Sequence, residues 1–509
     1  MQHLRTGAAY RAAIADGRKV WVVGAGEVTD VATHPATRAM VAEYVAWYDR
    51  HFDAAWQDRV LSPADSNGVR LPWGFVLPRS ADDLVAMGRC FSATIFLSAG
   101  NITHTPAYGQ LIALGILALV EERNVSAEQI ANARAYRDLI ARTGRFLTFA
   151  AGSAPIGFRM RADPADRAAL RLVRETTEGL VVSGMIGMHT SPAYAEDVYI
   201  GGHNGVDWGG HRASFVVPVN APGVRIVCRR PSARDEADFA APLSRRYDEL
   251  DGQMWLDDVL VPWNRIFLVE PSPDPVARWL FWHQLYCWLA KAEFTLGLGL
   301  ACTHAMGLLS DDATVGYLVD LIVDVQTVRS CLAAAERDPK FTASGYAYPN
   351  HAHIAAGSIA MLKARPHMSE ILRILPGSSL VVAPTDRDLA DPGMAPGFAA
   401  AFGGGGYTAA QRAALLNLAW DHVASALESR ESVYELHANG GIPIWRQRLR
   451  RCFEDYNSLA NAVMKQIDIA MPAIDVGALP AAPMVPRRTP TVTPPTNASP
   501  TTNSPRQTS

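Results

Sequence analysis

The pattern of hydrophobic and polar positions divides the chain into a helical part, a β-rich part and a second helical part. Up to about residue 150, apolar residues recur at helical spacing. Residues 111–120 are apolar on every side, which predicts a helix that is buried all round. Three of the predicted helices begin after a residue suited to capping a helix: Thr6, Ser80 and Ser126.

Between about 168 and 270, β-branched and aromatic runs alternate with turn residues, which predicts strands. Residues 212–228 form a strand, a turn at 220–223 and a second strand, and residues 170–183 predict a hairpin. Residues 22–27 resemble the start of a dinucleotide-binding fingerprint. The third glycine is missing and no helix follows, so the segment predicts a short hairpin instead.

From about residue 276 the pattern is helical again. Residues 281–309 are apolar on nearly every face, which is typical of a central bundle helix. Further helices are predicted over 314–335, 354–375, 409–429 and 447–470. Beyond residue 471 the chain is rich in Pro, Thr, Ser and Asn, and we expect disorder there. The predicted domains are therefore an α domain (1–150), a β domain (151–275), a helical bundle (276–470) and a tail (471–509).

Composition narrows the class of protein. The chain has 509 residues, of which 49% are hydrophobic and 19% charged, as expected for a globular protein with a large core. A net charge of −3 gives no basic surface for nucleic acid. The N-terminus lacks an apolar signal core, and no apolar run is long enough to span a membrane, so we expect a cytoplasmic protein. The six scattered cysteines predict buried thiols.

Short motifs from residue 6 to about residue 445 match one family. They are Thr6-Gly7-x-x-Tyr10, Asp16-Gly17-Arg18-x-Val20, Asp30-Val31-x-x-His34-Pro35, Val173-Arg174-Glu175-Thr176, Gly179-x-x-Val182-Ser183-Gly184, Pro222-Gly223, Cys228-Arg229-Arg230, Asp257-Asp258-Val259-x-Val261-Pro262-Trp263, Lys291-x-Glu293-Phe294, Leu418-Ala419-Trp420-Asp421 and Arg430-x-x-x-Tyr434-Glu435. In these motifs the chain resembles the flavin-dependent large oxygenase component of the 4-hydroxyphenylacetate 3-hydroxylases.

The resemblance implies an α+β fold of the acyl-CoA-dehydrogenase-like type, with an N-terminal α domain, a central β domain and a C-terminal four-helix bundle, assembled as a homotetramer. It implies FAD as the cofactor, supplied as FADH2 by a separate NAD(P)H-dependent flavin reductase. In such enzymes O2 is the co-substrate, and a flavin C4a-hydroperoxide transfers one oxygen to a small aromatic substrate, typically ortho to a phenol hydroxyl. That species needs a pocket that excludes water.

At the substrate site the chain departs from its family. Where many members have Arg-x-Pro-Asp-Tyr, this chain has residues 104–108, His-Thr-Pro-Ala-Tyr, and where members have Leu-Thr-His it has Phe149. The resemblance implies that His104 and Tyr108 are the catalytic and substrate-binding residues. Tyr194 and Ala195 lie on the family's substrate-facing loop. His104 is either the donor or base that replaces the lost groups or an ordinary packed or surface histidine.

The resemblance also implies the flavin-binding residues. Thr190 matches a family threonine near the flavin, Phe149, Ala150 and Ala151 line the ring, and Asn439 and Gly440 belong to a segment that closes over it.

No metal is expected in the chain. His189, His203 and His211 crowd the β-rich part, but no carboxylate or cysteine stands beside them at ligand spacing, so we interpret them as surface loop histidines. A dehydratase branch of this fold binds an iron–sulfur cluster through cysteines four residues apart, and here Thr94 follows Cys90 at that spacing.

Three functions are compatible with these residues. The first is a two-component FADH2-dependent monooxygenase that acts on a phenol or another electron-rich ring, in specialised metabolism, with a substrate that is either free or tethered to a carrier. The second is flavin-dependent N-oxygenation or a non-oxygenating oxidation, favoured by the lost arginine and histidine. The third is a catalytically lapsed scaffold protein.

Overall fold

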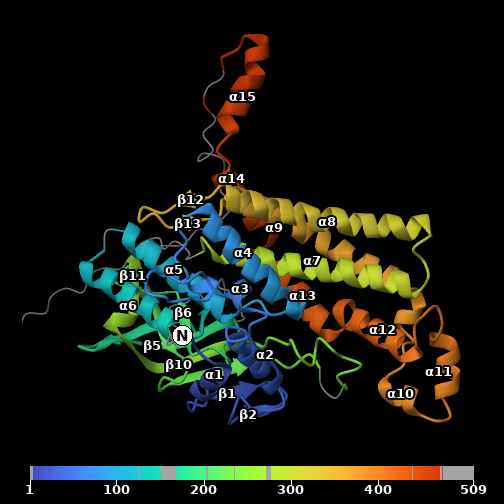
Figure 1. Ribbon diagram of the computed structural model, residues 1–509. Coiled ribbons are helices and arrows are strands. Elements are labelled where there is room, and N and C mark those ends of the chain that lie inside the picture. Colours follow the sequence, from blue (N-terminus) through green and yellow to red (C-terminus); the bar gives the residue numbers. More distant parts are fainter. Residues whose placement is uncertain are drawn as a thin grey trace, which may run out of the picture. The chain divides into compact units, whose positions relative to one another are not determined.

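The computed structural model describes residues 4–123, 125–150, 168–201, 205–233, 236–270, 277–437, 440–470 and 473 (Figure 1). The chain forms two compact units, residues 1–452 and residues 453–509. In the second unit the described elements are α15 (Tyr456–Met464) and the short helix η7 (Lys465–Ile467). Apart from residue 473, the predicted disordered tail lies outside the described residues.

The N-terminal part of the first unit is mainly helical, as predicted. Its helices are α1 (Gly7–Ala13), α2 (Arg38–Asp49), α3 (Gln57–Val60), α4 (Ala81–Ile95), α5 (Pro106–Glu122) and α6 (Ala127–Thr143), with the short η1 (Trp73–Phe75) and η2 (Phe96–Ser98). The side chains of Thr6, Ser80 and Ser126 each accept a backbone N–H at a helix start, which confirms the three predicted caps. Residues 106–120 of α5 are all buried, also as predicted.

Eleven strands within the described ranges form one sheet. They are β1 (Val20–Val22), β2 (Gly26–Val28), β3 (Leu147–Ala150), β4 (Arg171–Glu175), β5 (Gly179–Thr190), β6 (Asp197–Ile200), β7 (Val206–Trp208), β8 (His211–Pro218), β9 (Val224–Cys228), β10 (Asp251–Pro262) and β11 (Ile266–Glu270). The strand order is β11-β8-β6-β3-β5-β10-β9-β1-β2, with β4 beside β5 and β7 beside β8. The β1–β2 and β4–β5 hairpins are confirmed.

Two features of the sheet differ from the expectation. β8 and β9 are strands, as predicted for 212–228, but they do not pair with each other: β8 pairs with β6, β7 and β11, and β9 pairs with β1 and β10. The four-residue β3, from the part predicted as helical, inserts between β5 and β6. So short a segment has no diagnostic alternation, and its extended conformation depends on the partners that it pairs with.

The C-terminal part of the first unit is a helical bundle, as predicted. Its helices are α7 (Leu280–Ala305), α8 (Asp312–Arg337), α9 (His351–Ile374), α10 (Asp386–Ala390), α11 (Ala395–Phe402), α12 (Ala409–Val423), α13 (Ala426–His437) and α14 (Gly441–Cys452). The short strands β12 (Lys340–Phe341) and β13 (Ala347–Tyr348) connect α8 to α9, and η4 (Trp263–Arg265) and η5 (Gly377–Leu380) are single turns. The long helices α7, α8 and α9 pack side by side (Figure 1).

The predicted helix 409–429 is two helices, α12 and α13. The hydroxyl of Ser425 accepts the N–H of Glu428 at 3.3 Å, so a new helix begins there. The predicted helix 447–470 likewise falls across α14 and α15. Among the described helices, none is long and apolar enough to cross a membrane.

Candidate active site

The loop that carries His104 is pressed against α7. Ala99 and Gly100 have φ values of 55° and 76°, and a Cβ at Gly100 would lie 2.4 Å from the carbonyl oxygen of Cys287. Glycine is therefore required for this close approach. The loop ends at Thr105, which caps α5 and places Tyr108 in the first turn. The rings of His104 and Tyr108 consequently meet edge to face, with centroids 4.1 Å apart.

The carboxylate of Glu249, which precedes β10, organises this loop. It accepts the backbone N–H of Thr103 at 2.8 Å, that of His104 at 2.9 Å and the Thr103 hydroxyl at 2.7 Å. It also accepts the hydroxyls of Ser191 at 2.8 Å and Tyr44 at 3.1 Å. Burial raises the pKa of Glu249, while the charge of Arg430 and the bonds from Thr103 act in the opposite direction. One carboxylate thus fixes the position of the His104 backbone relative to the sheet.

Asp251, two residues further on, joins the sheet to the bundle. Arg430 of α13 donates to its two oxygens at 2.5 and 2.7 Å, Arg229 donates at 3.0 Å, and the Thr190 hydroxyl donates at 3.1 Å. Burial opposes ionisation of Asp251, but the charges and hydrogen bonds of Arg430 and Arg229 together outweigh it, and the pKa is lowered. Thr190 is therefore held by a carboxylate that remains ionised at neutral pH.

Three buried histidines surround this region. Burial lowers the pKa of His104, His189 and His283 to about 3, so the three imidazoles are neutral at neutral pH. The ring of His283, on α7, lies 5.4 Å from that of Tyr108. Burial also raises the pKa of Tyr108 well above its ordinary value, so its hydroxyl keeps its proton. These groups can therefore offer hydrogen bonds to a ligand without carrying charge.

The predicted flavin residues of β3 and β5 lie together. Ala150 pairs with His189, the Thr148 hydroxyl donates to the Thr190 carbonyl at 2.8 Å, and Phe149 stacks on Tyr199 with centroids 5.9 Å apart. Both ring nitrogens of His189 are buried and have no hydrogen-bond partner among the described residues. Unpartnered buried nitrogens are costly, and a cofactor with hydrogen-bonding edges would satisfy them. The residues present therefore fit a flavin.

The remaining predicted flavin and substrate residues lie on other segments or outside the described residues. Gly440, just before α14, is exposed, with a φ of 90°, and Ala151 and Asn439 lie outside the described residues. Tyr194 and Ala195 are both buried. Arg18 donates to the carbonyl of Ala195 at 2.6 Å. The Tyr194 ring packs against Tyr44, whose hydroxyl reaches the His104 carbonyl at 3.0 Å, so this loop adjoins the His104 loop.

One sequence interpretation is wrong. His189 is not a surface loop histidine but a buried residue of β5, because β3 and β10 flank that strand. His211 is exposed, as expected, but it is the first residue of β8 and does not lie in a loop, and His203 lies outside the described residues. Sequence reasoning also missed Thr103, Glu249, Asp251 and His283. The available signal was the spacing of Glu249 and Asp251, since alternate residues of an extended segment face the same side.

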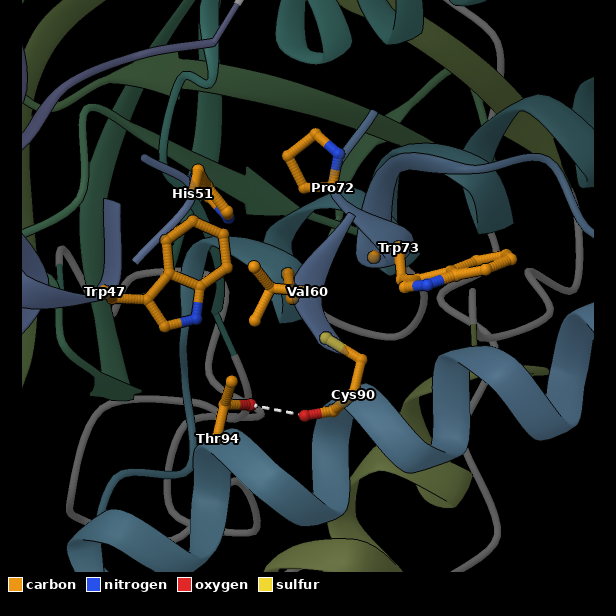
Figure 2. Close-up of a pocket in the computed structure, with 9 residues that line it drawn as sticks. Trp47, His51, Val60, Pro72, Trp73, Cys90 and Thr94 are labelled. Atoms are coloured by element: carbon orange, nitrogen blue, oxygen red, sulfur yellow. Dashed lines mark hydrogen bonds between the residues drawn. The ribbon is translucent and has the colours of Figure 1, made fainter. Parts of the chain in front are cut away.

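No group of three or more His, Cys, Asp or Glu residues in the described part of the chain could hold a metal ion. Cys90 and Thr94, at the spacing of the dehydratase cysteines, line a void of only about 10 Å³ beside His51 and Trp47. Figure 2 shows the Thr94 hydroxyl bonded to the Cys90 carbonyl, at 2.9 Å. A void of this size accommodates about one water, and a metal cluster would not fit.

The sheet packed with a helical bundle is a fold of the acyl-CoA-dehydrogenase-like type, and the buried polar groups beside β3 and β5 fit a flavin. The relatives described below are monooxygenase oxygenase components, so the protein is a flavin-dependent monooxygenase. Models of the 4-hydroxyphenylacetate 3-hydroxylase N-terminal and C-terminal regions match residues 6–268 and 276–465. The chain belongs to this family, with FAD as its cofactor. The predicted family, fold class and enzyme class are confirmed.

Individual relatives agree. The chain is 29% identical to the oxygenase component of 4-nitrophenol 4-monooxygenase/4-nitrocatechol 2-monooxygenase of Rhodococcus opacus, over 88% of this chain and 87% of that protein. It is 28% identical to the oxygenase component of 4-hydroxyphenylacetate 3-monooxygenase of Thermus thermophilus, over 91% and 98% of the two chains. A crystal structure of a 4-hydroxyphenylacetate 3-monooxygenase oxygenase component superimposes with a TM-score of 0.83 and 25% identity, over 91% and 99% of the two chains.

Proposed function

We propose that the protein is the oxygenase component of a two-component monooxygenase, which uses FADH2 from a separate NAD(P)H-dependent reductase and O2 to hydroxylate a phenol or another electron-rich aromatic molecule. The observation that carries this proposal is the connection between the predicted substrate residues of the His104 loop and the predicted flavin residue Thr190. Glu249 holds the His104 loop and Asp251 holds Thr190, and these two carboxylates lie two residues apart, just before and at the start of β10. Substrate and flavin residues are therefore fixed relative to each other.

The flavin-binding residues are Phe149, Ala150, Ala151, Thr190, Asn439 and Gly440. When bound, reduced FAD would supply the electrons that activate O2, and O2 would supply the oxygen atom that is transferred. The protein's task is to exclude water and hold both molecules. The Thr190 hydroxyl, whose hydrogen is used by Asp251, offers a lone pair, and His189 offers one donor and one acceptor.

His104 and Tyr108 orient the substrate, with Tyr194 and Ala195 on the neighbouring loop. The imidazole of His104 and the phenol of Tyr108 are both neutral, since burial lowers the pKa of His104 and raises that of Tyr108. They therefore position a hydroxyl or amine by hydrogen bonds. Oxygenation at nitrogen is a second candidate, favoured because a neutral site does not stabilise a phenolate.

The assembly proposed is a cytoplasmic homotetramer with domain boundaries near residues 150, 275 and 470. Support comes from an apolar stripe on the outer face of α8: Val315, Val319, Ile322 and Val323 are 37–57% exposed. A contiguous exposed stripe on a helix is typical of an interface, and a second copy of the bundle has the same composition. Val319→Asp should lower the mass measured by light scattering, and Val381→Asp, an exposed site outside the stripe, is the control.

The test is made with the whole protein. Anaerobic protein is mixed with photoreduced FAD and then with O2, and flavin absorbance and 18O incorporation into added phenols, indoles and amines are measured. We expect tight FADH2 binding and a labelled product with at least one of these ring classes. Binding without any 18O transfer to an organic product would contradict an oxygenase, and absence of binding would contradict the flavin site.

His104→Ala tests the substrate role. We expect product formation to fall by about 100-fold or more, as for loss of a positioning or proton-handling group, while the FAD dissociation constant changes less than threefold. His211→Ala, which removes an exposed histidine of β8, is the matched control. Equal losses of product formation and FAD affinity would show that His104 is a structural residue.

A further inference from the structure

A chain of hydrogen bonds runs from Glu249 through Thr103 to the ring of His104. The Thr103 Oγ1 atom lies 2.7 Å from Oε2 of Glu249 and 2.9 Å from Nδ1 of His104. All three residues are buried. Water therefore does not compete for these bonds, and the hydrogens must be distributed consistently along the chain.

The Glu249 end of this chain only accepts. Besides Thr103 Oγ1, its oxygens receive the backbone N–H groups of Thr103 and His104 and the hydroxyl of Ser191. The N–H groups are obligate donors. Burial raises the pKa of Glu249, and the charge of Arg430 and the hydrogen bonds from Thr103 and His104 act against that shift, so it is the set of donors around both oxygens that favours a carboxylate which only accepts. The single hydrogen of the Thr103 hydroxyl is consequently given to Glu249.

The proton position on His104 follows from that direction. A hydroxyl has one hydrogen and two lone pairs, so Thr103 presents a lone pair to the imidazole, and Nδ1 must carry the hydrogen. A neutral imidazole carries a single N–H, and the pKa of His104 is lowered to about 3 by burial. The other nitrogen, Nε2, is then without a proton.

We propose that Thr103 and Glu249 are positioning residues that hold His104 as the Nδ1-protonated tautomer, so that Nε2 accepts a hydrogen bond from the O–H or N–H of the substrate. That Nε2 meets the substrate rests on the proposed function, while the tautomer itself does not. The site then selects rings with a hydrogen-bond donor, because the lone pair of Nε2 repels an anionic oxygen.

The tautomer can be measured directly by NMR of the full-length protein labelled with 15N-histidine, without flavin or substrate. The His104 signals are those that disappear in His104→Asn. We expect a protonated, pyrrole-type Nδ1 and an unprotonated, pyridine-type Nε2 in the wild type and in Thr103→Ser. Thr103→Val, which keeps the shape and the backbone N–H but lacks the hydroxyl, should lose the single-tautomer pattern. Thr94→Val, a hydroxyl deletion near Cys90, should leave the His104 signals unchanged.

A protonated Nε2 in the wild type would overturn the inference, because Glu249 would then be the group that carries the proton. An unchanged spectrum in Thr103→Val would overturn the role of Thr103, and if that variant does not fold, the wild type and Thr103→Ser still decide the tautomer. Failure of FADH2 to bind would contradict the proposed function alone.

Discussion

A cluster of buried polar side chains in the bundle and another beside the sheet differ in how completely their hydrogen bonds are satisfied among the described residues. In the bundle, Lys291 lies 2.5 Å from Glu431 and 2.8 Å from Glu435, and Arg365 lies 2.6 Å from Glu428. Burial opposes the charge of Lys291, but the two carboxylates outweigh it and raise its pKa. Beside the sheet, His189 has two ring nitrogens without partners among the described residues, and the histidines are neutral.

The difference separates structural charge from ligand-binding capacity. The paired charges of the bundle hold α7, α9 and α13 together. Their hydrogen-bonding capacity is already used by one another, so they are poor groups for binding a ligand. Unsatisfied buried groups cost stability, which is tolerated at sites where a ligand completes the bonding. Arg430 connects the two regions, because it binds Asp251 and also Glu431.

The largest effect should come from the bundle. Lys291→Ala leaves Glu431 and Glu435 buried without their lysine, so we expect a loss of roughly 3–5 kcal/mol in the free energy of unfolding, measured by urea denaturation. Arg246→Ala removes an exposed partner of Glu43 and should cost less than about 1 kcal/mol. Similar losses in both variants would contradict the structural role of the bundle cluster.

The histidine cluster predicts acid instability. The pKa of His104, His189 and His283 is about 3 in the folded protein because of burial, and an unfolded histidine titrates near 6.5. The unfolded state therefore binds more protons, and the stabilising contribution, complete above about pH 6.5, is lost as pH falls toward 3. The melting temperature should fall between pH 7 and pH 4, and less so in His189→Leu. If the melting temperatures of the wild type and of His189→Leu fell equally with pH, His189 would take up its proton in the native state at the same pH as in the unfolded state, which would contradict the lowered pKa.

The smallest effect is expected for His189→Leu, which should change FAD affinity without lowering the melting temperature. His189→Leu removes the unpartnered nitrogens, so the melting temperature at pH 7.5 should stay the same or rise. FAD affinity should fall by about tenfold, the equivalent of one neutral hydrogen bond, as measured by fluorescence titration. His211→Leu, at an exposed position, should change neither quantity. Unchanged FAD affinity in His189→Leu would contradict a role for His189 at the flavin.

The sequence determined the elements with strong local signals. The helix caps at Thr6, Ser80 and Ser126, the all-buried α5 and the two hairpins follow from capping chemistry, periodicity and turn residues, which act within a few positions. The family motifs added the fold class, and they predicted roles at the site for His104, Tyr108 and Thr190.

Tertiary structure alone decided the rest. The strand β3, the separation of β8 from β9 and the burial of His189 depend on partners far away in the chain. Glu249 approaches His104 across 145 positions, and Arg430 approaches Asp251 across 179. Local composition gives no information about such contacts, because a charged residue near a strand start is ordinarily solvated. Only the packed fold shows which carboxylate is buried and which hydrogens it accepts.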